Sequence, residues 1–479
     1  MNKRIQIILL LMLLCLASCG STTEAPTNTD TSTQDTTAVE TDPLATVPVQ
    51  DLGGYTCTLY SSDLFDNFSI GEENGDVLND GIYRRDLAVS ERLHLTFEYQ
   101  TDSRDDLPKN VSNAVMAGDD VYDIVFGCFA SNGVTLLQGG NLIDLNTVAN
   151  FDFTKDYWSK LLTDELTYND RLYFTSGDIV PTFFYTQNVV LYNNAILDEM
   201  GMDSTPYDDV VANRWNYDAF LTYETAAAQD LNGDGKMDKT NDRYGFTYTA
   251  IASEGFYIAG GNYFFAGGVD GSIQANYIND RSSACIEELR SIFGDKNIAL
   301  YGQGDDFNNQ PAQILFFQDE RSLFIGCSID SIMDHARSME SDFTIVPCPK
   351  YDVSQTDYVS SINPWVNCAV MLPRSVSDSD RSGLIAENLA ALGKEYIRPA
   401  VYENVLHHKI ARNDESVEML EMIFSRSTVD LNTVYNFGNT PTVAKNYMMG
   451  NTTTYVSDLE KQLSAAETAI QDYVALFAE

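Results

Sequence analysis

Basic residues are scarce in this 479-residue chain: 29 Lys and Arg stand against 70 Asp and Glu, which gives a formal net charge of −41 at pH 7. Such a field repels the phosphates of nucleic acids and the anionic headgroups of lipids. The composition therefore argues against nucleic acid as a partner and against a basic membrane patch. Divalent cations and neutral ligands remain compatible with it.

Catalytic motifs are also missing. The sequence contains no HExxH, no GxSxG, no P-loop and no GxGxxG after a predicted strand. Its four histidines have no Cys, Asp or Glu at metal-ligand spacing: His94, His335, His407 and His408. Glycoside hydrolysis needs only two carboxyl groups that meet in space, so a secreted glycoside hydrolase stays open as an alternative.

The N-terminus carries an export signal. Lys3 and Arg4 precede an apolar run, Ile5 to Leu16, that is too short to span a bilayer. The run ends in Leu-Ala-Ser-Cys19, which is typical of a lipobox, in which the cysteine thiol takes the lipid. Residues 1–18 are therefore predicted to be a lipoprotein signal peptide, with lipidation of Cys19 anchoring the protein to the membrane. An ordinary secretory signal is the alternative.

Residues 19–50 contain Ser, Thr, Asp, Pro and Ala with few large apolar side chains, and we expect a disordered tether. The folded part is expected to follow it. Six cysteines remain there, at positions 57, 128, 285, 327, 348 and 368. An even count in an exported protein permits disulfides. Several of the six lie in apolar runs such as LFIGC and TIVPC, which favours buried small hydrophobes.

Strands and helices are predicted to alternate from Tyr55 onward, which indicates a mainly parallel sheet covered on both faces. Two long apolar runs interrupt the alternation, at residues 172–194 and 358–372. We interpret them as extended stretches that cross a hinge between two lobes, with Phe183, Phe184 and Tyr185 free to face a cleft. A buried strand pair in one large domain is the alternative interpretation.

The segment DLNGDGKMDKTND, residues 230–242, matches the first nine positions of an EF-hand loop. The oxygen ligands would be Asp230, Asn232, Asp234, the Lys236 carbonyl and Asp238, and Gly235 allows the turn. Asn241 stands where an acidic ligand is expected, so a loop longer by one residue would have to bring in Asp242. We predict a structural calcium ion here; a solvated acidic turn is the alternative.

Aromatic rings beside polar groups at predicted loops and hinges suit carbohydrates, because sugar rings have apolar faces and hydroxyl edges. The candidate ligand-binding residues are Phe129, Asn132, Asp178, Phe183, Tyr185, Glu254, Tyr257, Asp330, Asn363 and Trp365. For each of them, core packing or ordinary surface polarity is the competing interpretation.

The order of features resembles extracellular solute-binding proteins of family 1, the sugar-binding lipoproteins of ABC importers. The marks of this resemblance are the lipobox, DIVF before an aromatic-bearing loop, GGNLIDL, VVLYNNAILDEMGM, RWNYDAF, DLNGDGK with DRYGF, ERSLFIGCSID, TIVPCPKYD and RPAVYENVLHHKIARNDES. The chain departs from the family pattern at Asn193-Asn194, where Asn-Lys is usual.

The resemblance implies an α/β fold of the two-lobe periplasmic-binding-protein type II, with a hinge of crossing strands and no catalysis. By position it also implies sugar contacts at Phe129, near Phe183, at Glu254 to Tyr257 and at Ser328, Asp330 and Trp365. It implies a monomer on the extracellular face of the cell membrane that binds an oligosaccharide between its lobes and docks on an ABC permease. Binding of a peptide or another polar solute is the alternative. We expect lobe 1 at 51–180 and 367–425, the crossover and lobe 2 at 181–366, and C-terminal helices on lobe 2 at 426–479.

Overall fold

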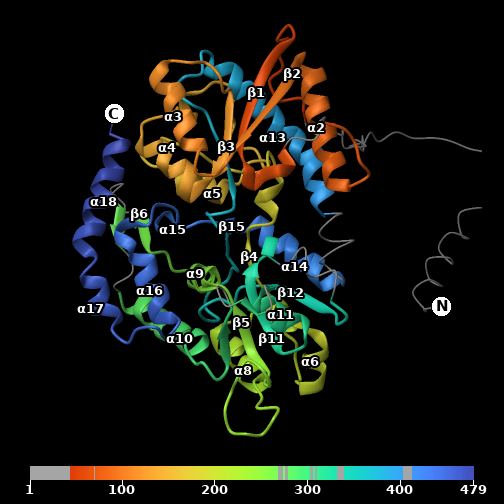
Figure 1. The fold of residues 1–479 in the computed structure, drawn as a ribbon, viewed down its shortest axis with the longest axis vertical. Coiled ribbons are helices and arrows are strands. Elements are labelled where there is room, and N and C mark those ends of the chain that lie inside the picture. Colours follow the sequence, from red (N-terminus) through yellow and green to blue (C-terminus); the bar gives the residue numbers. More distant parts are fainter. Residues whose placement is uncertain are drawn as a thin grey trace, which may run out of the picture. The chain divides into compact units, whose positions relative to one another are not determined.

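The computed structural model describes residues 44–68, 71–267, 273–275, 279–302, 306–307, 310–331, 339–402 and 413–478. Residues Thr46–Glu479 belong to one compact unit, in which strands and helices alternate along the chain (Figure 1). The predicted signal peptide, Cys19 and most of the predicted tether lie outside the described residues, as do His335, His407 and His408.

The first sheet has four strands in the spatial order β14-β3-β1-β2. They are β1 (Tyr55–Ser62), β2 (Leu95–Asp102), β3 (Ile124–Cys128) and β14 (Cys368–Met371). Strand β1 runs parallel to β2 and β3, while β14 runs antiparallel to β3. Every residue of β3 is buried, as expected for a parallel strand covered on both faces.

Helices α2 (Val77–Leu93) and α13 (Ser379–Tyr402) pack against each other beside this sheet. Asp76 caps α2 by accepting hydrogen bonds from the backbone N–H groups of Leu78 and Asn79. A Cβ atom at Gly81 would lie 2.8 Å from the Cβ of Ala400, so glycine permits the close approach of the two helices.

The second sheet has five strands in the order β12-β4-β11-β5-β8. They are β4 (Asn188–Asn193), β5 (Tyr244–Tyr248), β8 (Ala299–Tyr301), β11 (Ser322–Ser328) and β12 (Phe343–Pro347). Strand β4 is antiparallel to both of its neighbours. An aromatic core packs beside these strands: the rings of Phe220 and Phe324 stack with centroids 4.6 Å apart, and Phe246 meets Phe220 edge to face at 4.9 Å.

The other described elements connect or cover these sheets. They are η1 (Asp63–Phe68), α3 (Leu107–Ala117), η2 (Phe129–Gly133), α4 (Val134–Gln138), η3 (Leu145–Thr147), α5 (Lys160–Leu166), η4 (Pro181–Phe184), α6 (Asn194–Met200), α7 (Pro206–Val211), α8 (Tyr217–Ala227), α9 (Ala250–Ala259), β6 (Phe265–Gly267), β7 (Ile273–Ala275), α10 (Asp280–Phe293), β9 (Asp306–Phe307), β10 (Gln310–Pro311), α11 (Ala312–Gln318), β13 (Ser360–Ser361), α14 (Asp414–Ser425), β15 (Ser427–Thr428), α15 (Leu431–Tyr435), η6 (Phe437–Asn439), α16 (Thr440–Met448), α17 (Tyr455–Glu460) and α18 (Leu463–Leu476).

Three stretches of the chain meet between the two sheets, and we call their meeting point the seam. The first leads into β4, the second contains β13 and the third is β15. Strand β13 pairs with β15 in parallel, and Gln187 forms an antiparallel bridge with Ile362. The two long apolar runs of the sequence therefore do meet side by side, as expected for crossing strands.

The prediction of extended backbone throughout residues 172–194 is wrong at Pro181–Phe184, which form the short helix η4. Pro181 occupies the start of this helix, where its fixed φ suits a helical turn and its missing N–H costs nothing. Phe183, Phe184 and Tyr185 are buried and not free in an open cleft.

The C-terminal helices contact elements from two widely separated parts of the chain. Helix α16 packs against α9 and α10, whereas α18 packs near α4. Phe477, just after α18, meets the ring of Tyr173 at 5.2 Å. The predicted lobe boundaries stay predictions. In the part of the chain that the structure describes, no helix is both long and apolar enough to cross a membrane.

All six cysteines of the folded part are buried and free: Cys57, Cys128, Cys285, Cys327, Cys348 and Cys368. Burial raises the pKa of their thiols, which keeps them in the unreactive thiol form. The interpretation as buried small hydrophobes is confirmed.

We therefore expect a thiol reagent such as DTNB to react slowly with the native protein and to titrate these six thiols once the chain is unfolded in guanidinium chloride. Dithiothreitol should leave the melting temperature unchanged. A melting temperature that falls in reductant would reveal a disulfide and contradict this expectation.

Candidate functional site

The seam is held by backbone and amide hydrogen bonds. Asn363 N–H donates to the carbonyl of Thr186 at 2.7 Å, and Ile362 N–H donates to the carbonyl of Thr428 at 2.8 Å. The side chain of Asn188 donates to Ser361 Oγ at 2.9 Å. The two backbone bonds satisfy N–H and carbonyl groups outside the two large sheets, and the Asn188 bond ties β4 to β13.

Four of the predicted ligand-binding residues gather at this seam: Tyr185, Asp330, Asn363 and Trp365, which we call the seam cluster. Asp330 N–H donates to the carbonyl of Tyr185 at 2.7 Å. Trp365 N–H donates to Asn363 Oδ1 at 3.1 Å. The carbonyl of Pro364 accepts from Ala130 N–H at 3.0 Å, which brings the loop after β3 to the same place.

Trp365 is 46% exposed, although the other two tryptophans of the chain are buried. An exposed indole offers a large apolar surface on which a partner can pack. Two hydrogen bonds fix its backbone: Trp365 N–H donates to Asn363 Oδ1, and the neighbouring Pro364 carbonyl accepts from Ala130 N–H. The ring is therefore attached to an ordered stretch of backbone.

Two polar atoms of the seam cluster have no hydrogen-bond partner among the described residues, the hydroxyl of Tyr185 and Oδ1 of Asp330. Burial raises the pKa of both side chains; Asp76 adds to the effect at Tyr185, and a hydrogen bond from Ser328 opposes it at Asp330. An unpaired buried polar group costs free energy that a ligand hydroxyl can recover.

Ser328 supports this arrangement. It ends β11, is buried, and its hydroxyl lies 3.1 Å from that of Ser331. The residue thus contacts the start of the helical segment that carries Asp330.

Phe129 and Asn132 are fully buried and make internal contacts. Phe129 packs edge to face on Phe174 with ring centroids 5.6 Å apart. Asn132 accepts a hydrogen bond from Cys128 N–H at 2.9 Å and donates to the carbonyl of Arg104 at 2.7 Å. Both residues belong to η2. Ala130 of the same element donates its N–H to the carbonyl of Pro364, the residue before Trp365.

Glu254 and Tyr257 lie on α9 and are likewise buried. Glu254 pairs with Lys445 at 3.3 Å, and Tyr257 stacks on Phe264 with ring centroids 4.4 Å apart. The structure gives these two residues packing partners of their own and does not place them in the seam cluster.

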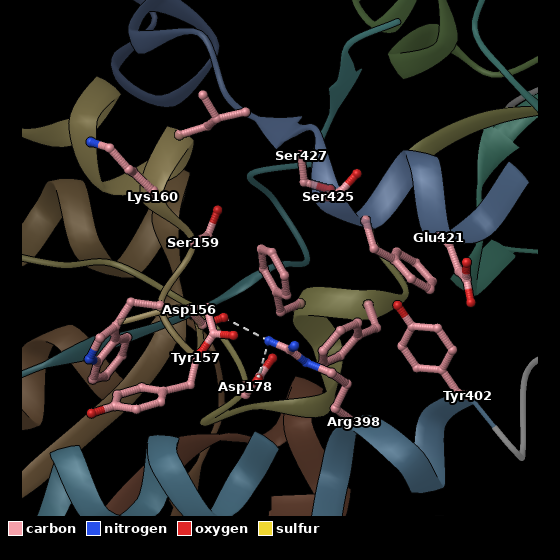
Figure 2. Close-up of a pocket in the computed structure, with 16 residues that line it drawn as sticks. Asp156, Tyr157, Ser159, Lys160, Asp178, Arg398, Tyr402, Glu421, Ser425 and Ser427 are labelled. Atoms are coloured by element: carbon pink, nitrogen blue, oxygen red, sulfur yellow. Dashed lines mark hydrogen bonds and ion pairs between the residues drawn. The ribbon is translucent and has the colours of Figure 1, made fainter. Parts of the chain in front are cut away.

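Asp178 and Phe183 line a separate cavity of about 340 Å³. Figure 2 shows this cavity, in which Arg398 of α13 reaches toward Asp178 and Asp156. Other lining residues were not predicted from the sequence, notably Arg398, Tyr402, Glu421 and Phe424. Arg398 and Tyr402 are four residues apart and so share one face of α13, a spacing that could have signalled a site.

The loop predicted to bind calcium folds on itself. The side chain of Asp242 points into this loop, which is the direction that a loop longer by one residue would need. It is buried, and its oxygens accept from the N–H groups of Leu231 at 3.0 Å and Asp238 at 2.6 Å. Asp230 accepts from Gly233 and Gly235, both at 2.7 Å. Within the described ranges, no three His, Cys, Asp or Glu side chains are placed as a metal-binding group.

No protein-family model matches this chain, and no curated protein matches it in sequence. Solved structures do match. The sugar-binding protein MalE from Xanthomonas citri is 10% identical, with a TM-score of 0.60 over 88% of this chain and 99% of that one. The cyclic alpha-maltosyl-1,6-maltose binding protein from Arthrobacter globiformis is 12% identical, with a TM-score of 0.58 over 88% and 100%.

An ABC substrate-binding protein from Listeria monocytogenes, solved in complex with cycloalternan, is 13% identical, with a TM-score of 0.54 over 88% of this chain and 99% of that one. At these identities the likeness shows the fold. The chain therefore has the α/β two-lobe fold of type II periplasmic-binding proteins, and the predicted fold class is confirmed.

Proposed function

We propose that this chain is the solute-binding component of an ABC importer and that it binds a carbohydrate, an oligosaccharide in particular, between its two lobes. The observation that carries the proposal is the seam cluster on this fold. The cluster combines an exposed indole ring with buried polar atoms that have no hydrogen-bond partner among the described residues, where stretches from both sheets meet. A sugar ring places its C–H face on an indole and its hydroxyl groups on such atoms.

The solved structures with this fold add independent support. Their descriptions name sugar-binding proteins and ligands such as maltotetraose and cycloalternan. They are binding proteins and not enzymes, which supports a function without catalysis. Binding would favour the state in which both lobes contact the ligand, because contacts made only in that state shift the population toward it.

The proposal is tested by a thermal-shift screen of linear and cyclic gluco-oligosaccharides, followed by mass spectrometry of each ligand after incubation. We expect a rise in melting temperature with at least one glycan, which is recovered intact. Cleaved glycan would establish a glycoside hydrolase instead. A rise with peptides and none with glycans would establish the peptide-binding alternative.

We further propose that Cys19 is lipidated, that the protein is held as a monomer on the outer face of the cell membrane, and that the loaded form docks on a membrane permease. The lipobox and the tether-like composition of residues 19–50 support the anchor. Replacing Cys19 by alanine should release the protein from the membrane fraction.

A structural calcium ion in the loop of residues 230–242 remains part of the proposal. The inward turn of Asp242 supports it, because this residue lies beyond the position that an EF-hand loop normally uses. Ligands would come from Asp230, Asn232, Asp234, Asp238 and Asp242 and from the Lys236 carbonyl, and the ion would stiffen the connection between α8 and β5.

Removal of calcium with EGTA should lower the melting temperature by several degrees, since an ion bound only to the folded state stabilises it by mass action. Added calcium should restore it. The variant Asp234→Asn is expected to need more calcium for the same rise. An unchanged melting temperature in chelator, together with no calcium retained after dialysis, would leave the loop as an acidic turn.

A further inference from the structure

The cavity lined by Asp178 and Phe183 shares no residue with the seam cluster. It lies among α5, η4, the end of α13, α14 and β15 (Figure 2). We propose that this cavity is a second ligand site, for a single neutral sugar ring or cyclic polyol. The cavity borders the seam, because Ser427 of β15 lines it, but it contains none of the four seam-cluster residues, so the proposal stands apart from sugar binding at the seam cluster.

The floor of the cavity is a charged pair. Asp178 is 1% exposed, and its Oδ2 lies 2.5 Å from Arg398 Nη2. The same nitrogen donates to the carbonyl of Asp156 at 2.7 Å. Nε of Arg398 has no hydrogen-bond partner among the described residues. The floor therefore presents a carboxylate acceptor and a guanidinium donor side by side.

This floor is built rigidly. Asp178 N–H donates to the carbonyl of Tyr157 at 2.9 Å. A Cβ atom at Gly393 would lie 2.1 Å from the carbonyl oxygen of Asp178, so only glycine lets α13 approach the crossover this closely. A carboxylate fixed by such contacts keeps its direction without a ligand, which lowers the entropy cost of binding one.

One wall of the cavity is aromatic. Phe184 lies 5.4 Å from Phe424 and 6.3 Å from Tyr402, and Phe183 lies 5.2 Å from Phe184, all with rings edge to face. Tyr402 and Phe424 are 5.5 Å apart. These rings offer an apolar surface opposite the charged floor.

The charges select the class of ligand. The lining contains three acidic side chains, Asp156, Asp178 and Glu421, and two basic ones, Lys160 and Arg398. An anion would be repelled by the acids and by the net charge of the whole chain, while a free cation would meet the guanidinium of Arg398. A neutral pair of adjacent hydroxyl groups can donate to Asp178 and accept from Arg398 Nε–H.

The volume agrees with a small ligand, because sites for small molecules begin at about 300 Å³. We expect a dissociation constant of about 1 mM or tighter for one ring, given the modest affinity each ligand atom supplies.

The tryptophans make the test specific, because Trp158 lines the cavity and Trp365 belongs to the seam cluster. The third, Trp215, is buried in the core beside the second sheet and serves as an internal reference. The full-length protein labelled with 5-fluorotryptophan gives one fluorine NMR signal from each of these residues. The probes are D-glucose, D-galactose and myo-inositol, with sulfate and tetramethylammonium as charged controls.

We expect at least one neutral probe to shift the Trp158 signal in a saturable way, both in the native chain and in the Trp365→Ala variant, and the charged controls to leave it in place. Ser425 lines the cavity and is exposed, so Ser425→Phe should fill the cavity mouth and abolish the shift, while Ser425→Ala keeps it. Arg398→Lys retains the charge but loses Nε–H, and should weaken binding at least tenfold.

A Trp158 signal that no neutral probe moves, or a shift that persists in Ser425→Phe, overturns the second site. Failure of sugar binding at the seam has a different signature, since it would leave the Trp365 signal unmoved by every oligosaccharide. The two proposals therefore fail separately.

Discussion

Replacing Trp365 by alanine is expected to weaken oligosaccharide binding by at least about tenfold, because the sugar loses the only exposed indole among the described residues. The melting temperature without ligand should change little, since the side chain is 46% exposed and packs on few neighbours in the free protein. Isothermal titration calorimetry with the glycan found in the screen measures the loss.

Two controls make this result specific. Trp365→Phe keeps an aromatic face and should retain part of the affinity, whereas Val353→Ala removes another exposed apolar side chain, one outside the seam cluster, and should retain all of it. Asp330→Asn keeps the shape of the carboxyl and tests the hydroxyl contact separately. Unchanged affinity in Trp365→Ala would remove the seam cluster from the ligand site.

The second large effect concerns Glu224 in α8. This side chain is fully buried, and neither carboxyl oxygen has a hydrogen-bond partner in the described ranges. Burial raises the pKa of Glu224 well above its ordinary value, and the carboxylate of Asp295 adds to the shift. The folded protein therefore holds a proton here that the unfolded chain releases above pH 4.5.

The sign of the pH dependence follows from this proton. Stability from Glu224 is fully present below the unfolded pKa and is lost as the pH rises toward the folded pKa, by about 1.4 kcal/mol per pH unit. Glu224→Gln keeps the shape without a proton to lose. Relative to the native chain, the variant should be nearly neutral at pH 5 and should become progressively more stable as the pH rises to 7.

Urea unfolding at pH 5, 6 and 7 measures the difference between the two chains. Glu467→Gln is the matched control, because Glu467 is exposed and its substitution should give the same difference at each pH. If Glu224→Gln shows no gain with rising pH, the Glu224 carboxyl has a charge partner in the folded protein and our description of its burial is wrong.

Much of the fold could be predicted from residue pattern alone. The predicted alternation of strands and helices from Tyr55 onward is present, since β1, α2, β2, α3 and β3 follow one another along the chain. Asn216 caps α8 by accepting a hydrogen bond from Ala219 N–H at 2.9 Å, and asparagine is a preferred residue at that position. These features succeed because caps and hydrophobic periodicity act over a few neighbouring residues.

The site was predicted only in part, and the reason is geometric. Tyr185, Asp330 and Trp365 lie in stretches that the sequence pattern marks as hinge or loop, and the structure brings them together. Phe129 and Tyr257 fitted the same criteria but are packed inside. Sequence pattern does not distinguish a ring that faces a ligand from one that faces its own core, because both follow the same strand or loop.

By itself the sequence determined the α/β character of this protein, its acidic surface charge and the two apolar stretches that cross between sheets, since composition and short-range periodicity encode these properties. Only the tertiary structure decided that Trp365 is exposed while Phe129 is buried, and that Asp178 meets Arg398, a residue 220 positions away in the chain. Contacts of this kind depend on how whole helices and strands pack. The free energy of packing is distributed over residues far apart in the chain, so no short stretch of sequence encodes the contact.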